Sequence, residues 1–268
     1  MRPAARWFAE SWFQRRAPTS RLLTAARRGN AAAQFQLASI LLDQAGAARQ
    51  AETWLRRAAA LGHAPAQYRL SLLYLSGARP RGAAAIWYAA ANDTPAERNR
   101  ALLYPDGFDV APAFEKSFAL AEAAAAQGLA LAQSHLGMLY LREIGCRRDD
   151  AAALRWFRLA ADQADAGGAL GLAIIHEHGL GLPRDMAAAA RWYAQAVARG
   201  NEAAATALGL LYLKGQGVSR DLAKAQRLLQ RPASLGDHRA RDGLAEIERQ
   251  RDAAQSETLA PDPRLATS

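Results

Sequence analysis

The chain has 268 residues, of which 51% are hydrophobic and 7% aromatic, and it carries a net charge of +9. This length can bury a core as one elongated domain or two compact ones. Abundant alanine with few β-branched residues predicts an all-α protein. The single cysteine, Cys146, excludes an internal disulfide framework and a cysteine-built metal site. No apolar run reaches the roughly 18 residues that a membrane span needs.

The N-terminal segment, residues 1–28, holds seven arginines against one acidic residue, so most of the basic charge lies there. Residues 2–17 have an amphipathic helical pattern that places Trp7, Phe8 and Trp12 on one face. Three roles fit this basic amphipathic segment: a cap over the open end of the next element, an anchor on an anionic membrane, or a nucleic-acid contact. A nucleic-acid contact is disfavoured because no second basic or aromatic stripe continues along the chain.

Residues 29–235 repeat one pattern about six times, with copies that start near 29, 62, 92, 128, 164 and 200. The last three copies align at a 36-residue period, and the first two have shorter middle loops. The copy at 92 is degraded: Asp109, Ala113 and Leu120 replace its glycine, aspartate and tryptophan.

Each copy contains two apolar stripes at helical spacing. The first and second stripes are illustrated by Ala205, Leu208, Gly209, Tyr212 and by Ala189, Trp192, Tyr193, Ala196. Small residues opposite large ones allow the two helices to approach closely. Helices of roughly 12–14 residues are marginal alone, so we expect each pair to be stabilised by stacking on its neighbours.

A Gly-x-Gly sequence separates the two stripes, at residues 179–181 and again at 215–217. It fits either a phosphate-binding loop or a tight corner. A phosphate loop would follow a strand and occur once, whereas a left-handed helix cap requires glycine. The pattern therefore predicts corners, with Asp149, Asp185 and Asp221 capping the second helices.

The combined pattern A-x-x-L-G-x-x-Y, G-x-G-V, D-x-x-x-A and W-Y-x-x-A-A resembles the Sel-one-like repeat family, relatives of the tetratricopeptide repeats, from residue 29 to about 245. The resemblance implies an α/α solenoid, a right-handed superhelix of antiparallel helix pairs whose first helices line a concave surface. It also implies a non-catalytic scaffold or adaptor for protein partners. Cysteine-rich members, linked to β-lactam binding, carry a disulfide in every repeat; this chain lacks those cysteines, so that activity is not expected.

In the related tetratricopeptide frame, the concave groove would hold a protein or peptide partner. The groove residues predicted in this frame are Phe35, Tyr68, Leu72, Leu131, Ser134, Met138, Leu141, Arg142, Leu170, Ile174, Glu177, Thr206, Leu210 and Lys214. The alternative for each position is packing between neighbouring repeats.

No catalytic, metal-binding or cofactor-binding set is predicted. His176 and His178 flank Glu177, but residues two apart on a helix point about 200° apart and cannot jointly hold a metal. No nucleophile lies beside a general base at an informative spacing, which disfavours a hydrolase. Cys146 falls under a corner, and we expect it to be buried and unreactive.

At the other end, Pro232 is expected to shorten or kink the last second helix. Residues 236–252 read as a C-terminal capping helix and residues 253–268 as a disordered tail. Without a signal peptide or membrane span, we expect a bacterial cytoplasmic protein, or a periplasmic one if the true start lies upstream. The oligomeric state is not predicted.

Overall fold

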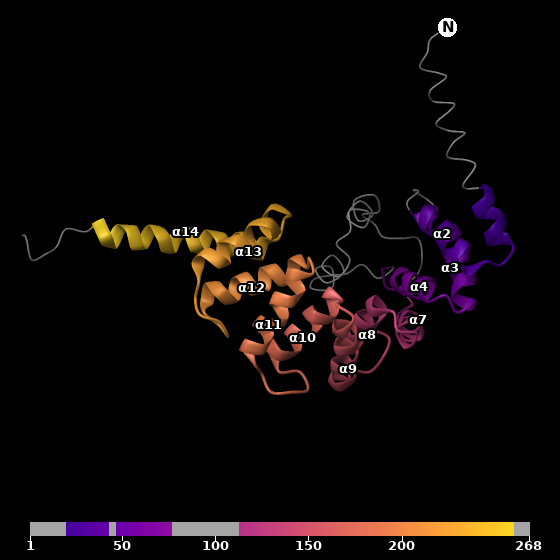
Figure 1. Ribbon diagram of the computed structural model, residues 1–268, viewed down its shortest axis with the longest axis horizontal. Helices are drawn as coiled ribbons and strands as arrows, with labels where there is room; N and C mark the ends of the chain where they lie inside the picture. The colour runs from indigo at the N-terminus through magenta and orange to yellow at the C-terminus, as the bar shows by residue number, and fades with distance from the viewer. Residues whose placement is uncertain (1–19, 43–46, 77–112, 260–268) are drawn as a thin grey trace, which may run out of the picture. The chain divides into compact units, whose positions relative to one another are not determined.

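The computed structural model describes residues 20–42, 47–76 and 113–259, and the regular elements among them are all α-helices (Figure 1). A helical segment at 20–27 precedes helices that share a length of 12 or 13 residues, except for the last one. Their bounds are α2 Ala31–Leu42, α3 Ala48–Ala60, α4 Ala64–Ser76, α7 Phe114–Ala126, α8 Ala130–Arg142, α9 Asp150–Asp162, α10 Ala166–His178, α11 Met186–Ala198, α12 Glu202–Lys214, α13 Leu222–Ser234 and α14 His238–Leu259. Within these ranges, none of the helices is both long and apolar enough to cross a membrane.

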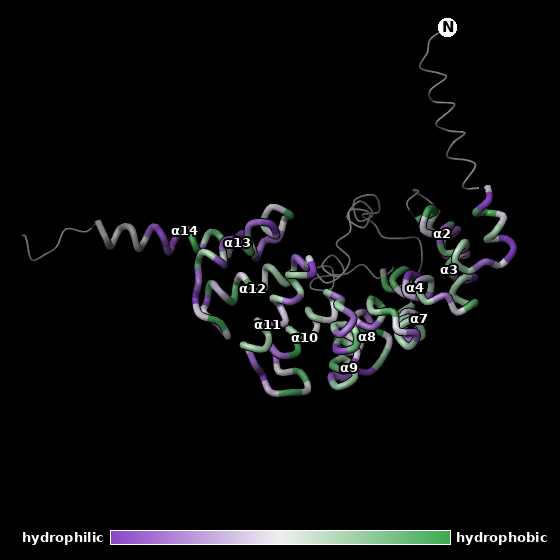
Figure 2. Tube along the Cα trace, viewed as in Figure 1, coloured by the Kyte–Doolittle hydropathy of each residue, from purple (hydrophilic) through white to green (hydrophobic). Residues whose placement is uncertain are grey.

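The chain forms two compact bodies, residues 1–163 and residues 164–268. In each body a helix packs against the helices next to it in the chain: α2 on α3 and α8 on α9 in the first body, α10 on α11 and α12 on α13 in the second. Neighbouring pairs are joined through α3/α4, α7/α8, α11/α12 and α13/α14. Hydrophobic and hydrophilic residues are interspersed along the helices (Figure 2). The predicted stacking of helix pairs is thus present inside each body.

Helix α4 is paired with α7. The sequence had placed these two helices in different copies, α4 in the copy that starts near 62 and α7 in the degraded copy at 92–128. The Ser117 hydroxyl donates to the Ser71 carbonyl at 2.9 Å, and the Gln127 amide donates to the Gln67 amide oxygen at 2.7 Å. The two helices therefore act as the first and second members of one pair. The chain between them, residues 77–112, lies outside the described residues.

The predicted caps and corners are confirmed. The carboxylates at the start of α9, α11 and α13 accept backbone N–H groups of residues three positions on; the pairs are Asp149–Ala152 at 2.7 Å, Asp185–Ala188 at 2.8 Å and Asp221–Lys224 at 2.9 Å. Gly179 and Gly215 end α10 and α12 in the left-handed region, with φ of 69° and 68°. Gly-x-Gly is a corner of the fold.

Close helix approach also follows the predicted pattern of small residues against large ones. A Cβ atom added at Gly137 on α8 would lie 2.8 Å from the Phe157 ring on α9. One added at Gly209 on α12 would lie 2.8 Å from Leu229 on α13. These glycines let the first and second helices of a pair interlock.

A chain of buried glutamines links successive elements of the first body. The Gln34, Gln67 and Gln133 side chains donate to the carbonyls of Ala26, Ala59 and Ala125, each eight residues earlier. Two of the three amide oxygens accept in turn from a glutamine after the paired helix: that of Gln67 from Gln127, and that of Gln133 from Gln163 at 2.8 Å. The position equivalent to Gln127 and Gln163 in the first pair is Leu61, so the amide oxygen of Gln34 is buried without a partner.

Leu61→Gln is expected to stabilise the first body by about 1 kcal/mol, because it supplies the missing donor and removes a leucine that is 59% exposed. Urea unfolding monitored by amide hydrogen exchange in α2 measures the gain. Leu235→Gln is the matched control. Leu235 holds the position of Leu61 in the last pair, but the position of Gln34 is occupied there by Ala205, which has no amide oxygen to accept the new hydrogen bond. Equal gains in both variants would contradict the role assigned to Gln34.

The C-terminal predictions need two corrections. Helix α13 keeps the full 13 residues despite Pro232, which lies buried in its last turn. The carbonyls of Arg231 and Pro232 still accept the N–H of Leu235, so the turn closes normally. Helix α14 extends to Leu259, so residues 253–259 are helical, where a tail was predicted.

Candidate partner-binding surface

In the first body, six of the eight predicted groove residues keep some exposed surface. Leu131 on α8 is 45% exposed. The half-buried residues are Phe35, Tyr68, Met138, Leu141 and Arg142. Partial burial lowers the pKa of Arg142, but a guanidinium stays charged in proteins. Leu72 and Ser134 are buried, with 3% and 8% of their surface exposed, and cannot contact a partner in this conformation.

In the second body, Lys214 is exposed and the half-buried residues are Ile174, Glu177 and Leu210. Leu170 and Thr206 are buried, at 3% and 2% exposure. As for Leu72 and Ser134, this burial favours the alternative of packing between neighbouring repeats. The Thr206 hydroxyl donates to the Asp237 carboxylate, 2.7 Å away at the start of α14.

The repeat position shared by Phe35, Tyr68 and Thr206 connects one first helix to the next. The Phe35 ring lies 5.2 Å from the His63 ring, and the Tyr68 ring meets His135 edge-on at 5.8 Å. This position therefore packs between repeats, and the more accessible face is carried by the other predicted positions, Leu131, Met138 and Leu141 above all.

His135 is the most perturbed histidine of this surface. Its Nε2 atom is buried without a hydrogen-bond partner, and burial lowers the pKa of the imidazole to about 4. The ring is therefore neutral at physiological pH and serves to pack α8 against Tyr68.

The His176, Glu177 and His178 side chains do not converge. His176 is half-buried in the position of a repeat tyrosine, and its Nδ1 atom has no partner. Glu177 accepts a hydrogen bond from the buried Tyr193 hydroxyl, whose pKa is raised by burial and by that carboxylate. His178 is exposed. Among the described residues, no three His, Cys, Asp or Glu side chains are grouped as a metal site would require.

Cys146 lies under the α8–α9 corner, as expected, but it is half-buried where full burial was predicted. Its thiol contacts the Leu139 carbonyl at 3.7 Å. Burial and then the charge of Glu143 raise the pKa of the thiol, which disfavours the reactive thiolate.

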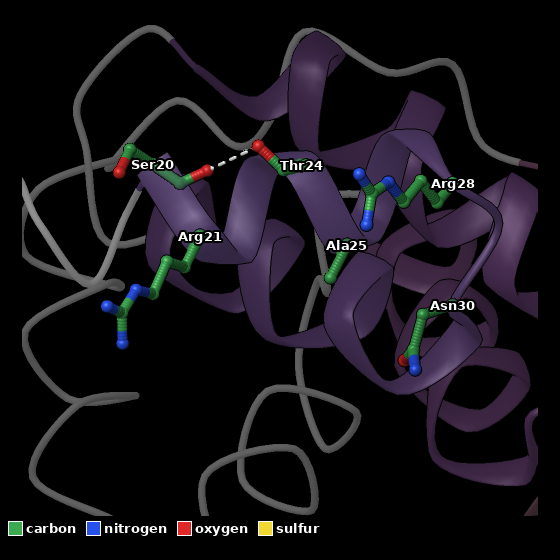
Figure 3. A pocket seen from close by; sticks show the side chains of 6 residues that line it. All are labelled: Ser20, Arg21, Thr24, Ala25, Arg28 and Asn30. Atoms are coloured by element: carbon green, nitrogen blue, oxygen red, sulfur yellow. Dashed lines mark hydrogen bonds between the residues drawn. The ribbon is translucent and has the colours of Figure 1, made fainter.

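A shallow pocket of about 440 Å³ adjoins the helical segment 20–27 (Figure 3). The residues that line it are Ser20, Arg21, Thr24, Ala25, Arg28 and Asn30. The Thr24 hydroxyl donates to the Ser20 carbonyl at 2.9 Å. The lining lacks a general base beside a nucleophile, and none of it comes from residues 176–178.

Comparison with known proteins decides the family. A model of the Sel1 repeat matches six consecutive segments, at residues 31–63, 64–93, 94–129, 130–165, 166–201 and 202–237. The chain belongs to the Sel1 repeat family. Proteins of the Sel1 repeat family generally act as protein-interaction scaffolds and are typically non-catalytic.

Solved Sel1 repeat structures share the fold. A Sel1 repeat protein from Oxalobacter formigenes is 23% identical with a TM-score of 0.61, over 79% of this chain and 74% of that one. A Sel1 repeat protein from Klebsiella pneumoniae subsp. pneumoniae is 21% identical with a TM-score of 0.50, over 86% and 97%. The all-α solenoid class predicted from the sequence is confirmed. No curated protein matches the chain significantly.

Several structural residues were not predicted. Asn30, Asp165 and Asn201 cap first helices, accepting the backbone N–H of Ala33, Gly168 and Ala204. The glutamine chain was also missed, although a glutamine after alanine at one position of three copies was a visible signal. The aromatic face of Trp7, Phe8 and Trp12 lies outside the described residues, so its cap or membrane role remains a prediction.

Proposed function

We propose that this Sel1 repeat protein is a non-catalytic scaffold that binds a protein partner along the exposed face of its first helices. The observation that supports the proposal is the apolar face of α8. Leu131, Met138 and Leu141 are spaced at i, i+7 and i+10, so they share one side of the helix. Leu131 is 45% exposed, and the other two are half-buried.

An apolar stripe of this spacing suits an amphipathic helix or an extended peptide. Arg142 at the end of the same face adds a charge that favours an acidic group on the partner. In the second body, Ile174 and Leu210 hold the position of Met138, and Lys214 holds that of Arg142. The position of Leu131 is taken by Gly167 and Ala203, and that of Leu141 by Glu177 and the buried Leu213. The apolar face is therefore most complete on α8, which is where we place the partner.

The Leu131→Glu variant tests this face. Because Leu131 is already exposed, the charge should leave folding intact while it disrupts an apolar contact, and we expect recovery of partners to fall by roughly tenfold in affinity capture from the native cell. Leu159→Glu is the matched control, since Leu159 is 47% exposed on α9, a second helix. A set of captured proteins that is the same for both variants and the wild type would contradict the proposal.

A further inference from the structure

The excess of basic over acidic residues is concentrated in the first repeats of the protein. Residues 1–76 contain eleven arginines against three acidic residues, a net charge of +8, and the remaining chain is left with +1. By contrast, residues 113–163 contain six basic and six acidic side chains. The asymmetry therefore extends beyond the N-terminal segment into the folded helices, where the structure describes the side chains.

No free carboxylate offsets this charge on the described surface. Within the described residues 20–42 and 47–76, Glu52 is the one acidic residue, and its side chain is half-buried. It accepts the Tyr74 hydroxyl at 3.1 Å and lies 3.9 Å from the Arg56 guanidinium. Arg27, Arg28 and Arg57 are exposed. The field of these helices is accordingly positive.

An exposed leucine lies among these arginines at the ends of the second helices. Leu61, 59% exposed, follows α3, and Arg57 precedes it by one turn on the same side. Arg28 holds the position of Leu61 at the end of segment 20–27, because Arg28 directly precedes Gly29 as Leu61 precedes Gly62, and both glycines have a positive φ. Arg28 also lines the pocket with Arg21 (Figure 3). We call Arg28, Arg57 and Leu61 the basic edge.

We propose that the basic edge rests on an anionic lipid bilayer and tethers the scaffold to the membrane surface. Arginine beside a protruding apolar side chain suits the bilayer interface, where the guanidinium meets headgroup phosphates and the leucine enters the acyl boundary. A nucleic acid would attract the arginines but offers Leu61 no apolar medium. The segment before residue 20 continues the same combination in sequence, with Trp7, Phe8 and Trp12 among arginines.

The second body provides an internal reference for this edge. Arg231 and Leu235 occupy the positions of Arg57 and Leu61 in the last pair, and Leu235 is 46% exposed. Arg231, however, is ion-paired with Glu202 at 2.5 Å, in a part of the chain where acidic and basic residues are balanced. The second body therefore carries the same pair of side chains, an arginine and an exposed leucine, without an excess of positive charge around them.

Co-sedimentation of the full chain with phosphatidylcholine vesicles, about a third of the lipid being phosphatidylglycerol, tests the proposal. We expect binding that falls with added salt and is lost on pure phosphatidylcholine. Arg57→Gln with Leu61→Gln should weaken the apparent Kd by roughly tenfold, because it removes one cation and one inserting side chain. Arg231→Gln with Leu235→Gln should bind like the wild type.

Three results would overturn the membrane proposal: no binding of the wild type to anionic vesicles, equal losses in the two double variants, or an unchanged Kd in the Arg57/Leu61 variant. Binding of a short DNA duplex that is weakened by the Arg57/Leu61 variant, without vesicle binding, would assign the edge to nucleic acid instead. Circular dichroism of each variant checks that the helices remain folded. The outcome is independent of partner capture through α8.

Discussion

Alanine in place of Gly217 is expected to destabilise the second body by about 3 kcal/mol or more, one of the largest effects of any single methyl group in this protein. Gly217 has φ of 71°, and a Cβ atom there would lie 2.2 Å from the backbone oxygen of Met186. Relief requires the corner to separate from the first turn of α11, because the obstructing atoms belong to the backbone. Gly145 makes the same approach to the Phe114 carbonyl, also at 2.2 Å.

Gly200→Ala is the matched control. Gly200 has a similar positive φ of 86°, but no atom lies within 4 Å of the added Cβ. Ala164 naturally holds the equivalent position with φ of 60°. The control should therefore cost only about 1 kcal/mol of backbone strain. Amide exchange in α11 to α13 distinguishes the two variants. A similar loss of protection in both would show that the close approach of the Met186 backbone does not explain why residue 217 is glycine.

The fold was predictable because its signals are local and repeated. Asp185, Gly179 and the small residue Gly209 act through neighbours within one helix pair, and each recurs at the same position of several copies. A helix pair needs its neighbours for stability, so the period itself predicted the stacking. The family assignment rests on the same recurrence.

The sequence could not separate exposed from buried positions of the predicted surface, because exposure depends on what the next repeat supplies. Thr206 and Leu210 are both on α12 and were assigned to the same groove. Thr206 is buried against Asp237, which directly precedes α14, whereas Leu210 remains half-buried. Periodicity reports the side of the helix on which a residue lies, but it does not report how closely the following helix covers that side.

The pairing of α4 with α7 shows a second limit. The sequence predicted separate copies that start near 62 and 92, yet the hydrogen bonds from Gln127 and Ser117 join α7 directly to α4. The contacts Ser71–Ser117 and Gln67–Gln127 join residues 46 and 60 positions apart, and a repeat of fixed length does not predict such separations. Matching side chains across the pair, glutamine with glutamine and serine with serine, are the signal that the sequence did contain.

Acid is expected to destabilise the first body through His135, and His135→Leu is expected to remove that effect. The folded pKa is about 4, against 6.5 for the ordinary imidazole, so the unfolded chain takes up a proton between these values while the folded chain does not. Stability is therefore complete above pH 6.5, falls as the pH drops toward 4, and levels off below it. The total loss is about 3 kcal/mol.

Urea unfolding at a series of pH values, read by amide exchange in α8, measures this loss. In His135→Leu the leucine retains apolar contact with Tyr68, so the stability at pH 7 should change little while the acid-dependent loss between pH 6.5 and 4 disappears. The control is His178→Leu, because His178 is exposed in the second body and its replacement should leave the acid dependence of α8 as it is in the wild type. Should His135→Leu lose stability in acid as steeply as the wild type, another group must carry the proton, and burial of this imidazole would not be what makes the first body acid-sensitive.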